Sequence, residues 1–267
     1  MLQHTIGFIG AGQMAQALAR GFLRAGLLAP DHLIAFDPVP DALRKFCTEC
    51  GGARSAASNA VVAHQADILL LATKPQNLQS VTKELAGQVA GKLIVSILAG
   101  VPLSRLAELG TNRIIRVMPN TPCLVGQGAC AYCLGPGATP ADAGLVGQLL
   151  SAVGIAIAVD EKHLDAVTGL SGSGPAFVYL MIEALSDGGV RMGLPREVAM
   201  ALAAQTVRGA AEMVLTQKEH PAVLKDRVAS PGGTTIAGLA VLEERGLRSA
   251  LISAVEQAAR RSAELGK

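Results

Sequence analysis

The sequence predicts an α/β domain with a doubly wound, mostly parallel sheet, followed by an all-α domain. Short aliphatic runs alternate with helical patterns in the first half, and runs such as Ile68–Leu71 are apolar on both faces. A parallel strand covered by helices on both sides of its sheet has this continuous apolar pattern, and the alternation is typical of βαβ units. From Glu161 onward only helical periodicity remains, so we expect domains at residues 1–160 and 161–267.

The expected elements follow the chain in a regular order. Gly193–Pro195 and His220-Pro221 mark breaks between helices of the second domain. Gly128–Leu134 and Ile155–Val159 are candidates for two additional strands. The other expected strands are Thr5–Ile9, Leu33–Phe36, Ile68–Ala72, Leu93–Ile97 and Arg113–Met118, and helices are expected near Gln13–Ala25, Asp41–Cys50, Ala60–His64, Leu78–Val89 and Leu103–Leu109.

Composition excludes several classes of protein. Only 16% of the 267 residues are charged and 50% are hydrophobic, which excludes intrinsic disorder. A net charge of +2, with 3% aromatic residues and no Trp, offers no basic or stacking surface for nucleic acid. Pro or Gly residues interrupt the long uncharged runs 117–141 and 143–159, so we expect no membrane-spanning helix in them. The first residues do not resemble a signal peptide, and we expect a cytoplasmic protein.

The cysteines include two CxxC pairs, Cys47/Cys50 and Cys130/Cys133, plus Cys123. Cys130 and Cys133 fall on an expected strand, where residues three apart point to opposite faces. The histidines show no HxxxH spacing either, so we expect no metal site. An odd number of cysteines in a reducing compartment fits free thiols.

A glycine-rich motif lies between the first expected strand and the first expected helix. It reads Gly10-Ala11-Gly12-Gln13-Met14-Ala15, which is GxGxxA. The first glycine permits a tight turn, the second lets the backbone approach a pyrophosphate, and the helix N-terminus attracts the phosphates. The position at the start of a βαβ series favours dinucleotide binding over a glycine-rich turn without a ligand.

Further polar residues follow the later strands at the same edge of the sheet. Asp37 ends the second strand, where an acid would hydrogen-bond a ribose 2′-hydroxyl and repel a 2′-phosphate, although it could simply start a turn. This favours NADH, but the nearby Arg44 and Lys45 leave the choice of cofactor open. The turns at Lys74-Pro75, Ala99-Gly100 and Asn120-Thr121-Pro122 are placed for a nicotinamide, since ligands bind at the carboxyl ends of parallel strands.

The second domain contains two glycine-rich segments that precede apolar helical patterns. Ser171–Pro175 is expected to start a helix, with Pro175 near its first turn. In Ser230-Pro231-Gly232-Gly233-Thr234-Thr235, we expect Ser230 to cap the next helix. The glycines free backbone amides for a carboxylate at the helix N-terminus, and the threonines add two hydroxyls; a capping turn without a ligand is the alternative.

The absence of lysine from one helical region bears on the type of reaction. Between Lys162 and Lys218 the sequence has no lysine that could serve as the proton-transfer group which hydroxyacid oxidation needs. Reduction of a protonated imine requires less help from the protein.

With these residues assembled, the chain resembles the pyrroline-5-carboxylate reductase family over its whole length. The specific segments are Asp165–Ala176, Arg191–Arg196 and His220–Leu239. The resemblance implies an N-terminal Rossmann domain, a helical substrate and dimerisation domain, and reduction of L-Δ1-pyrroline-5-carboxylate to L-proline with NADPH or NADH. It also implies a homodimer through the C-terminal helices and leaves open a higher homo-oligomer such as a decamer. From composition and the interrupted apolar runs, we expect neither nucleic acid nor membrane as a partner.

The resemblance also assigns roles to single residues. Thr235 would face the ring nitrogen of the substrate as the catalytic residue, while Asp37 and Thr73 depart from residues seen in family members. The motifs and the resemblance together predict cofactor binding by Gly10, Ala11, Gly12, Gln13, Met14, Asp37, Asn59, Thr73, Lys74, Ala99 and Asn120, and substrate binding by Glu161, Ser230, Gly233 and Thr234.

Two alternatives remain. One is an oxidoreductase of the same two-domain plan that acts on a hydroxyacid, against which the missing lysine counts. The other is a dinucleotide-sensing module without catalysis, which would have no use for the carboxylate site at residues 230–235.

Overall fold

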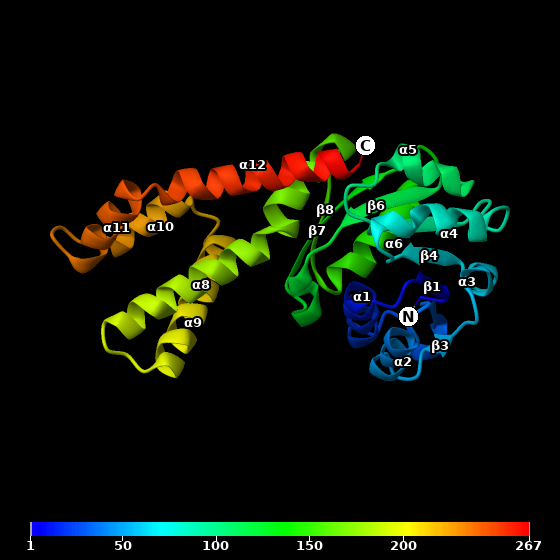
Figure 1. Ribbon diagram of the computed structural model, residues 1–267, viewed down its shortest axis with the longest axis horizontal. Coiled ribbons are helices and arrows are strands. Elements are labelled where there is room, and N and C mark those ends of the chain that lie inside the picture. Colours follow the sequence, from blue (N-terminus) through cyan, green and yellow to red (C-terminus); the bar gives the residue numbers. More distant parts are fainter. Residues whose placement is uncertain (1, 267) are drawn as a thin grey trace. The chain divides into compact units, whose positions relative to one another are not determined.

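The computed structural model describes residues 2–266. The first part of the chain forms a single sheet of eight strands (Figure 1). The strand order is β3-β2-β1-β4-β5-β6-β7-β8, and every pair is parallel except β6 and β7. The order reverses between β1 and β4, which confirms the doubly wound arrangement. The strands are β1 (Ile6–Ile9), β2 (Leu33–Phe36), β3 (Arg54–Ser55), β4 (Ile68–Leu71), β5 (Leu93–Ser96), β6 (Ile114–Met118), β7 (Gly128–Leu134) and β8 (Gly154–Ala158).

Helices cover both faces of this sheet. Along β1, Phe8 packs into one apolar cluster with helices α1 and α6, and Ile9 packs into a second cluster with α3 and α4. Successive strand residues point to opposite faces, so a strand between two helical layers must be apolar throughout. The helices are α1 (Gln13–Arg24), α2 (Pro40–Glu49), α3 (Asn59–Gln65), α4 (Leu78–Leu85), α5 (Leu103–Leu106), α6 (Pro140–Ser151) and α7 (Leu164–Val167).

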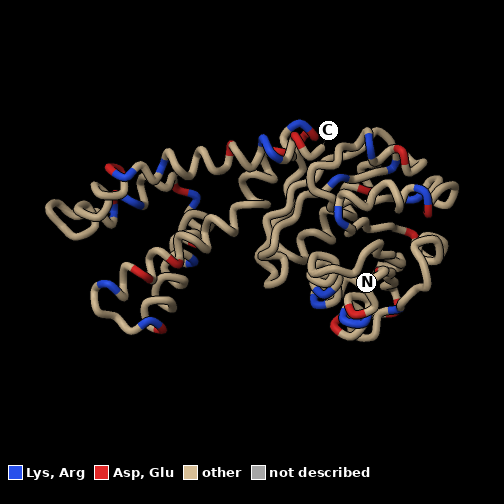
Figure 2. The backbone as a smooth tube through the Cα atoms, in the orientation of Figure 1, with Lys and Arg blue, Asp and Glu red and all other residues tan. Residues whose placement is uncertain are grey.

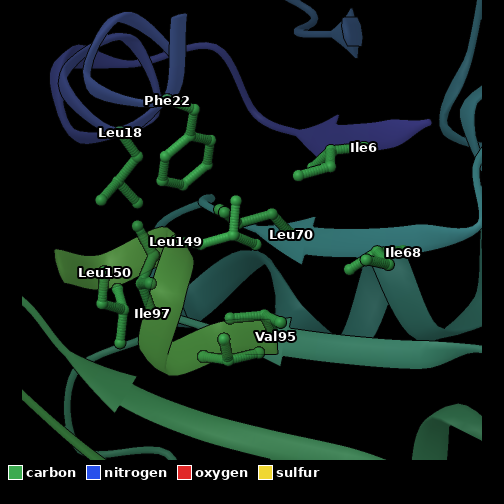
Figure 3. A pocket seen from close by; sticks show the side chains of 10 residues that line it. Ile6, Leu18, Phe22, Ile68, Leu70, Val95, Ile97, Leu149 and Leu150 are labelled. Atoms are coloured by element: carbon green, nitrogen blue, oxygen red, sulfur yellow. The ribbon is translucent and has the colours of Figure 1, made fainter. Parts of the chain in front are cut away.

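The first cluster is closely packed. Figure 3 shows side chains from β1, β4 and β5 converging with Leu18 and Phe22 of α1 and Leu149 of α6. The space left among them is about 10 Å³, which is too small for a ligand. The first cluster therefore stabilises the sheet by apolar packing and has no room for a ligand.

The expected elements agree with the structure, with three differences. No helix was expected at α6, Pro140–Ser151, which contains two glycines and starts at a capping box formed by Thr139 and Asp142. The edge strand β3 was missed, because its two residues are both exposed and carry no apolar pattern. The helix expected at Leu78–Val89 ends at Leu85, and Gly87 follows with a positive φ of 75°. The antiparallel β7 follows β6 after a short 3-10 turn, η4 (Thr121–Val125), which is too short for a parallel crossover.

Five helices make up the rest of the chain, and no strand occurs in residues 161–266. The predicted breaks at residues 193–195 and 220–221 are confirmed, and the expected helix start near Pro175 is confirmed at Gly174. The helices are α8 (Gly174–Arg191), α9 (Arg196–Gln217), α10 (Pro221–Val228), α11 (Thr234–Glu244) and α12 (Leu247–Leu265) (Figure 1).

By packing, the chain divides into two units. The sheet unit contains the chain up to Ser173 and from Glu256 onward, and the helical unit is Gly174–Val255. The end of α12 belongs to the sheet unit, where Ser262 donates a hydrogen bond to Asp165 (2.7 Å). This division describes packing rather than composition, so the domain boundary expected at residue 160 remains a prediction.

The helical unit exposes much of its apolar surface. Only Ser186, Ala199 and Ala203 are buried among its described residues, while Met192, Leu215 and Val228 are each more than 60% exposed. Figure 2 shows long uncharged stretches along α8 and α9. Of the described helices, α9 is long and apolar enough to cross a membrane by length and composition, a test that core and interface helices also pass.

Candidate functional site

The glycine-rich loop has the geometry of a phosphate site. Gly10 has a φ of 99°, and a side chain there would lie within 2.8 Å of the Ala72 carbonyl, so only glycine fits. Gly12 is the N-cap of α1 without any side-chain cap, and the space where its side chain would be is open. The first amides of α1 are therefore available to an anion, which the helix dipole also attracts. This cradle fits the pyrophosphate of a dinucleotide.

Asp37 holds this loop through hydrogen bonds that the sequence did not predict. Its Oδ2 accepts from the Ala11 amide (2.8 Å) and its Oδ1 accepts from the Val39 amide (2.9 Å). The carboxylate therefore both starts a turn and fixes the middle of the glycine-rich loop. A carboxylate accepts about four hydrogen bonds, so two bonds leave capacity for a ribose hydroxyl.

The neighbouring residues expected near the ribose have other partners as well. Asn59, at the start of α3, is buried, and its Nδ2 donates to Oε2 of Glu84 (2.8 Å). Arg44 pairs with Asp41 on the surface of α2. The proposed contacts of Asn59 and Arg44 with a nucleotide remain predictions.

The residues expected at the nicotinamide end lie after adjacent strands. Thr73 and Lys74 follow β4, Ala99 follows β5 and Asn120 follows β6, and these three strands are hydrogen-bonded neighbours. Lys74 and Ala99 are exposed, whereas Asn120 is buried. A cleft of about 770 Å³ opens at this edge, lined by Pro75, Ala99, Val101 and Leu265 among others.

Asn120 links this edge to a segment that sequence reasoning did not single out as a site. Its Oδ1 accepts from the Ala129 amide (2.9 Å), and its Nδ2 donates to the Ser171 carbonyl (3.1 Å). Ser171 lies in a π-helical turn, Thr168–Gly172, a conformation that is frequent at functional sites. A side chain at Gly172 would lie 2.5 Å from Cε of Met118, so glycine allows the turn to approach the end of β6.

Glu161 is engaged in an ion-pair network within the sheet unit. Its Oε1 accepts from the Leu103 amide (2.6 Å) and from Nη1 of Arg116 (3.1 Å). Arg116 is buried on β6 and lies 3.9 Å from Asp165, which also accepts from Ser262. A buried guanidinium needs such counter-charges. The carboxylate of Glu161 thus already has partners within the protein, and its contact with substrate stays a prediction.

The segment of the helical unit that is expected to bind a carboxylate starts its helix differently from the prediction. Gly233, not Ser230, is the N-cap of α11, which has no side-chain cap hydrogen bond. The Ser230 carbonyl accepts from the Gly233 amide (3.0 Å), and Gly232 takes a positive φ of 66°. The predicted capping role of Ser230 is therefore wrong. Because no side chain makes a capping hydrogen bond at this helix start, the amides of its first turn are available to an anion beside Thr234 and Thr235.

The cysteines are placed as the strand pattern predicted. Cys130 and Cys133 point into different apolar clusters, and burial raises the pKa of Cys133 to about 11. Among residues 2–266, no group of three or more His, Cys, Asp or Glu side chains is arranged to hold a metal ion.

The uncapped glycine-rich loop, the doubly wound sheet and the polar residues at its carboxyl edge define a Rossmann-type nicotinamide-nucleotide-dependent oxidoreductase. Two family models match this chain. Residues 161–265 match the family described as pyrroline-5-carboxylate reductase dimerisation, and residues 5–100 match the family described as NADP oxidoreductase, coenzyme F420-dependent.

Curated relatives and solved structures agree with these matches. Pyrroline-5-carboxylate reductase of Methanosarcina acetivorans is 47% identical over 100% of both chains, and that of Arabidopsis thaliana is 48% identical over 98% of this chain and 95% of the relative. A crystal structure of the Plasmodium falciparum enzyme with NADP bound has 36% identity and a TM-score of 0.91, covering 100% of both chains. The chain belongs to the pyrroline-5-carboxylate reductase family.

Proposed function

We propose that this protein reduces L-Δ1-pyrroline-5-carboxylate to L-proline, the final step of proline biosynthesis, with NADPH or NADH. The observation that carries the proposal is the uncapped start of α11, where free backbone amides lie beside the hydroxyls of two threonines. A cyclic imine with one carboxylate matches that set of donors. The family to which the chain belongs supports the same reaction. The Plasmodium falciparum relative with bound NADP supports the choice of cofactor.

The residues of this chain bind and orient the reactants. The glycine-rich loop, Gly10–Met14, holds the pyrophosphate, and the turns at Lys74, Ala99 and Asn120 hold the nicotinamide half. When bound, the reduced nicotinamide supplies the hydride for the C=N carbon. Positioning of this kind contributes on the order of 7–11 kcal/mol in the most favourable cases.

The helical unit handles the substrate. The substrate carboxylate is bound by Ser230, Gly233 and Thr234, and Glu161 also contacts the substrate. Thr235 donates a hydrogen bond to the ring nitrogen. The protonated imine carries its own positive charge, so the reaction needs no strong acid from the protein. This agrees with the absence of lysine between residues 162 and 218.

The choice between the two cofactors depends on Asp37. Its negative charge lies beside the glycine-rich loop, where it disfavours a 2′-phosphate, while it also fixes the loop through the Ala11 amide. We therefore expect the replacement Asp37→Ser to raise the NADPH/NADH activity ratio. An unchanged ratio would mean that Asp37 acts on the loop alone.

The exposed apolar faces of the helical unit support a homodimer through the C-terminal helices, in line with the dimerisation description of the matching family model. Contact with a second copy would cover the faces of α8, α9 and α11, and a higher oligomer such as a decamer is part of the proposal. We also propose that the two domains divide at residue 160 and that the protein is cytoplasmic. Free thiols fit that location.

The proposed role of Thr235 is tested by steady-state kinetics of Thr235→Ala. We expect kcat to fall while the Kd for NADPH stays unchanged, and Thr235→Ser to restore most of the rate because it keeps the hydroxyl. Thr216→Ala is the matched control, since the exposed Thr216 hydroxyl donates only to the Glu212 carbonyl of its own helix. An unaffected kcat in Thr235→Ala would remove Thr235 from the reaction.

A further inference from the structure

Two buried cysteine side chains meet in the sheet unit. Cys123 lies in the 3-10 turn η4 and Cys130 in β7, and their Sγ atoms are 3.6 Å apart. Their exposed fractions are 0% and 2%. Neither CxxC spacing accounts for this contact, because Cys133 faces a different cluster and Cys47 and Cys50 belong to the region of α2.

The backbone around the pair is adapted to hold these two sulfur atoms together. A side chain at Gly128 would overlap the Sγ of Cys123, so glycine leaves room for the thiol beside β7. β7 is hydrogen-bonded to β6 on one side and to β8 on the other, which fixes Cys130. Any closer approach of the two sulfur atoms therefore has to come from the turn.

The two thiols differ in acidity. The hydrogen bond from the Cys130 thiol lowers the pKa of Cys123, and the same bond together with burial raises the pKa of Cys130. The contact thus favours a thiolate on the sulfur that accepts the hydrogen bond, while the sulfur that donates keeps its proton.

We propose that Cys123 and Cys130 form a dithiol that a peroxide oxidises to an intramolecular disulfide, and that this bond weakens the binding of the nicotinamide nucleotide. The chemistry balances in two steps. The Cys123 thiolate attacks a peroxide oxygen, the O–O bond breaks, and a sulfenic acid forms with release of hydroxide. The Cys130 sulfur then attacks the sulfenic sulfur, the S–S bond forms, and the S–O bond breaks. The leaving hydroxide and the Cys130 proton form water, so two thiols are oxidised and one peroxide is reduced to two waters.

Access comes through the turn. Leu124 and Val125, which follow Cys123 in η4, are 37% and 70% exposed, so a local opening of these five residues uncovers Cys123 without disturbing the sheet. A small oxidant such as hydrogen peroxide reaches the sulfur in that open state. β7 remains in place for the second step.

The link to cofactor binding is Asn120, and this half of the proposal rests on the proposed function. The Asn120 carbonyl accepts from the Cys123 amide (3.1 Å), and its side chain bonds the Ala129 amide and the Ser171 carbonyl. A disulfide needs the sulfur atoms at about 2.05 Å. The turn must therefore move toward β7, and Asn120 moves with it at the edge proposed for the nicotinamide.

The test uses the full chain treated with hydrogen peroxide, alkylated and digested for peptide mapping, with the Kd for NADPH measured before and after treatment. We expect a Cys123–Cys130 linkage with loss of two hydrogen atoms, a several-fold rise in Kd, and recovery with dithiothreitol. Cys123→Ser and Cys130→Ser should both abolish the linkage and the change in Kd. Cys133→Ser, a buried thiol on the same strand, should leave both intact.

Two results would overturn the inference. If both thiols are still alkylated after peroxide has oxidised the more accessible Cys47, the pair is not an oxidisable dithiol. If the linkage forms and the Kd is unchanged, the bond does not act on the cofactor site. Neither readout requires turnover of the pyrroline, and mapping of the unmutated protein decides the first point even if the serine variants fold poorly.

Discussion

The replacement Gly233→Ala tests whether the start of α11 binds the substrate carboxylate. The backbone of Gly233 has φ −81° and ψ 177°, which alanine adopts without strain. The added methyl group, however, would overlap the Ser230 hydroxyl and lie 3.2 Å from the Ser230 carbonyl. The hydroxyl has to rotate away, so the variant removes one donor from the proposed site while leaving the backbone conformation allowed.

The expected size follows from the lost contact. A hydrogen bond to a charged group contributes about 1.5–3 kcal/mol, which corresponds to about a 10- to 160-fold loss in kcat/KM for the pyrroline. Alanine is also a poorer N-cap than glycine, which costs about 1 kcal/mol of helix stability at most. The KM for NADPH should not change, because the glycine-rich loop lies in the sheet unit.

The assay is steady-state kinetics with substrate and cofactor varied separately. Gly238→Ala is the control, because the position lies in the same helix, has open space for a methyl group, and gains helix propensity. In the double variant with Ser230→Ala, the loss should be no greater than in Ser230→Ala alone, since both changes remove the same donor. A substrate KM and kcat/KM unchanged in Gly233→Ala, or an equal loss in Gly238→Ala, would show that the start of α11 does not bind the substrate carboxylate.

Three further predictions concern the sheet unit. The hydrogen bond from Arg113 lowers the pKa of Asp142 to about 2, so the pair should stabilise the fold by about 2 kcal/mol above pH 4 and lose this contribution as the pH falls toward 2. Denaturant unfolding of Asp142→Asn over a pH series should show a deficit that vanishes near pH 2; a deficit independent of pH would contradict this. Ser262→Ala should cost about 1 kcal/mol and speed amide hydrogen exchange in the last turn of α12, because the bond to Asp165 is lost; unchanged exchange would show that this bond does not hold the helix end. Asp37→Asn should weaken the binding of NADH more than that of NADPH in titrations, because it disturbs the ordered glycine-rich loop for both but removes the charge that disfavours the 2′-phosphate; an unchanged Kd for NADH would argue that the loop keeps its shape without the carboxylate.

The sequence predicted the fold where a single physical requirement produced a visible pattern. Buried parallel strands such as Ile68–Leu71 must be apolar on both faces, and Gly193–Pro195 can only interrupt a helix, so these elements were found close to their observed bounds. The glycine-rich loop was found for the same reason. β3 escaped because two exposed residues carry no pattern.

The site was predicted less completely, because its contacts join residues far apart in the chain. Arg116 meets Glu161 after 45 residues, and Asp165 meets Ser262 after 97, and no spacing rule links them. The N-cap of α11 depends on backbone angles at Gly233 rather than on the presence of Ser230 nearby. The CxxC spacing drew attention to the wrong pairs, since the two sulfur atoms that meet belong to a turn and a strand.

The proposed reductase activity is tested most directly by oxidation of NADPH and NADH, run in parallel, with L-Δ1-pyrroline-5-carboxylate as the substrate. We expect oxidation that depends on the pyrroline with at least one cofactor, and formation of L-proline in equal amount. No oxidation with either cofactor, in a folded sample that binds the nicotinamide nucleotide, would contradict it. A hydroxyacid substrate or a sensing role would then have to explain the glycine-rich loop and the uncapped start of α11.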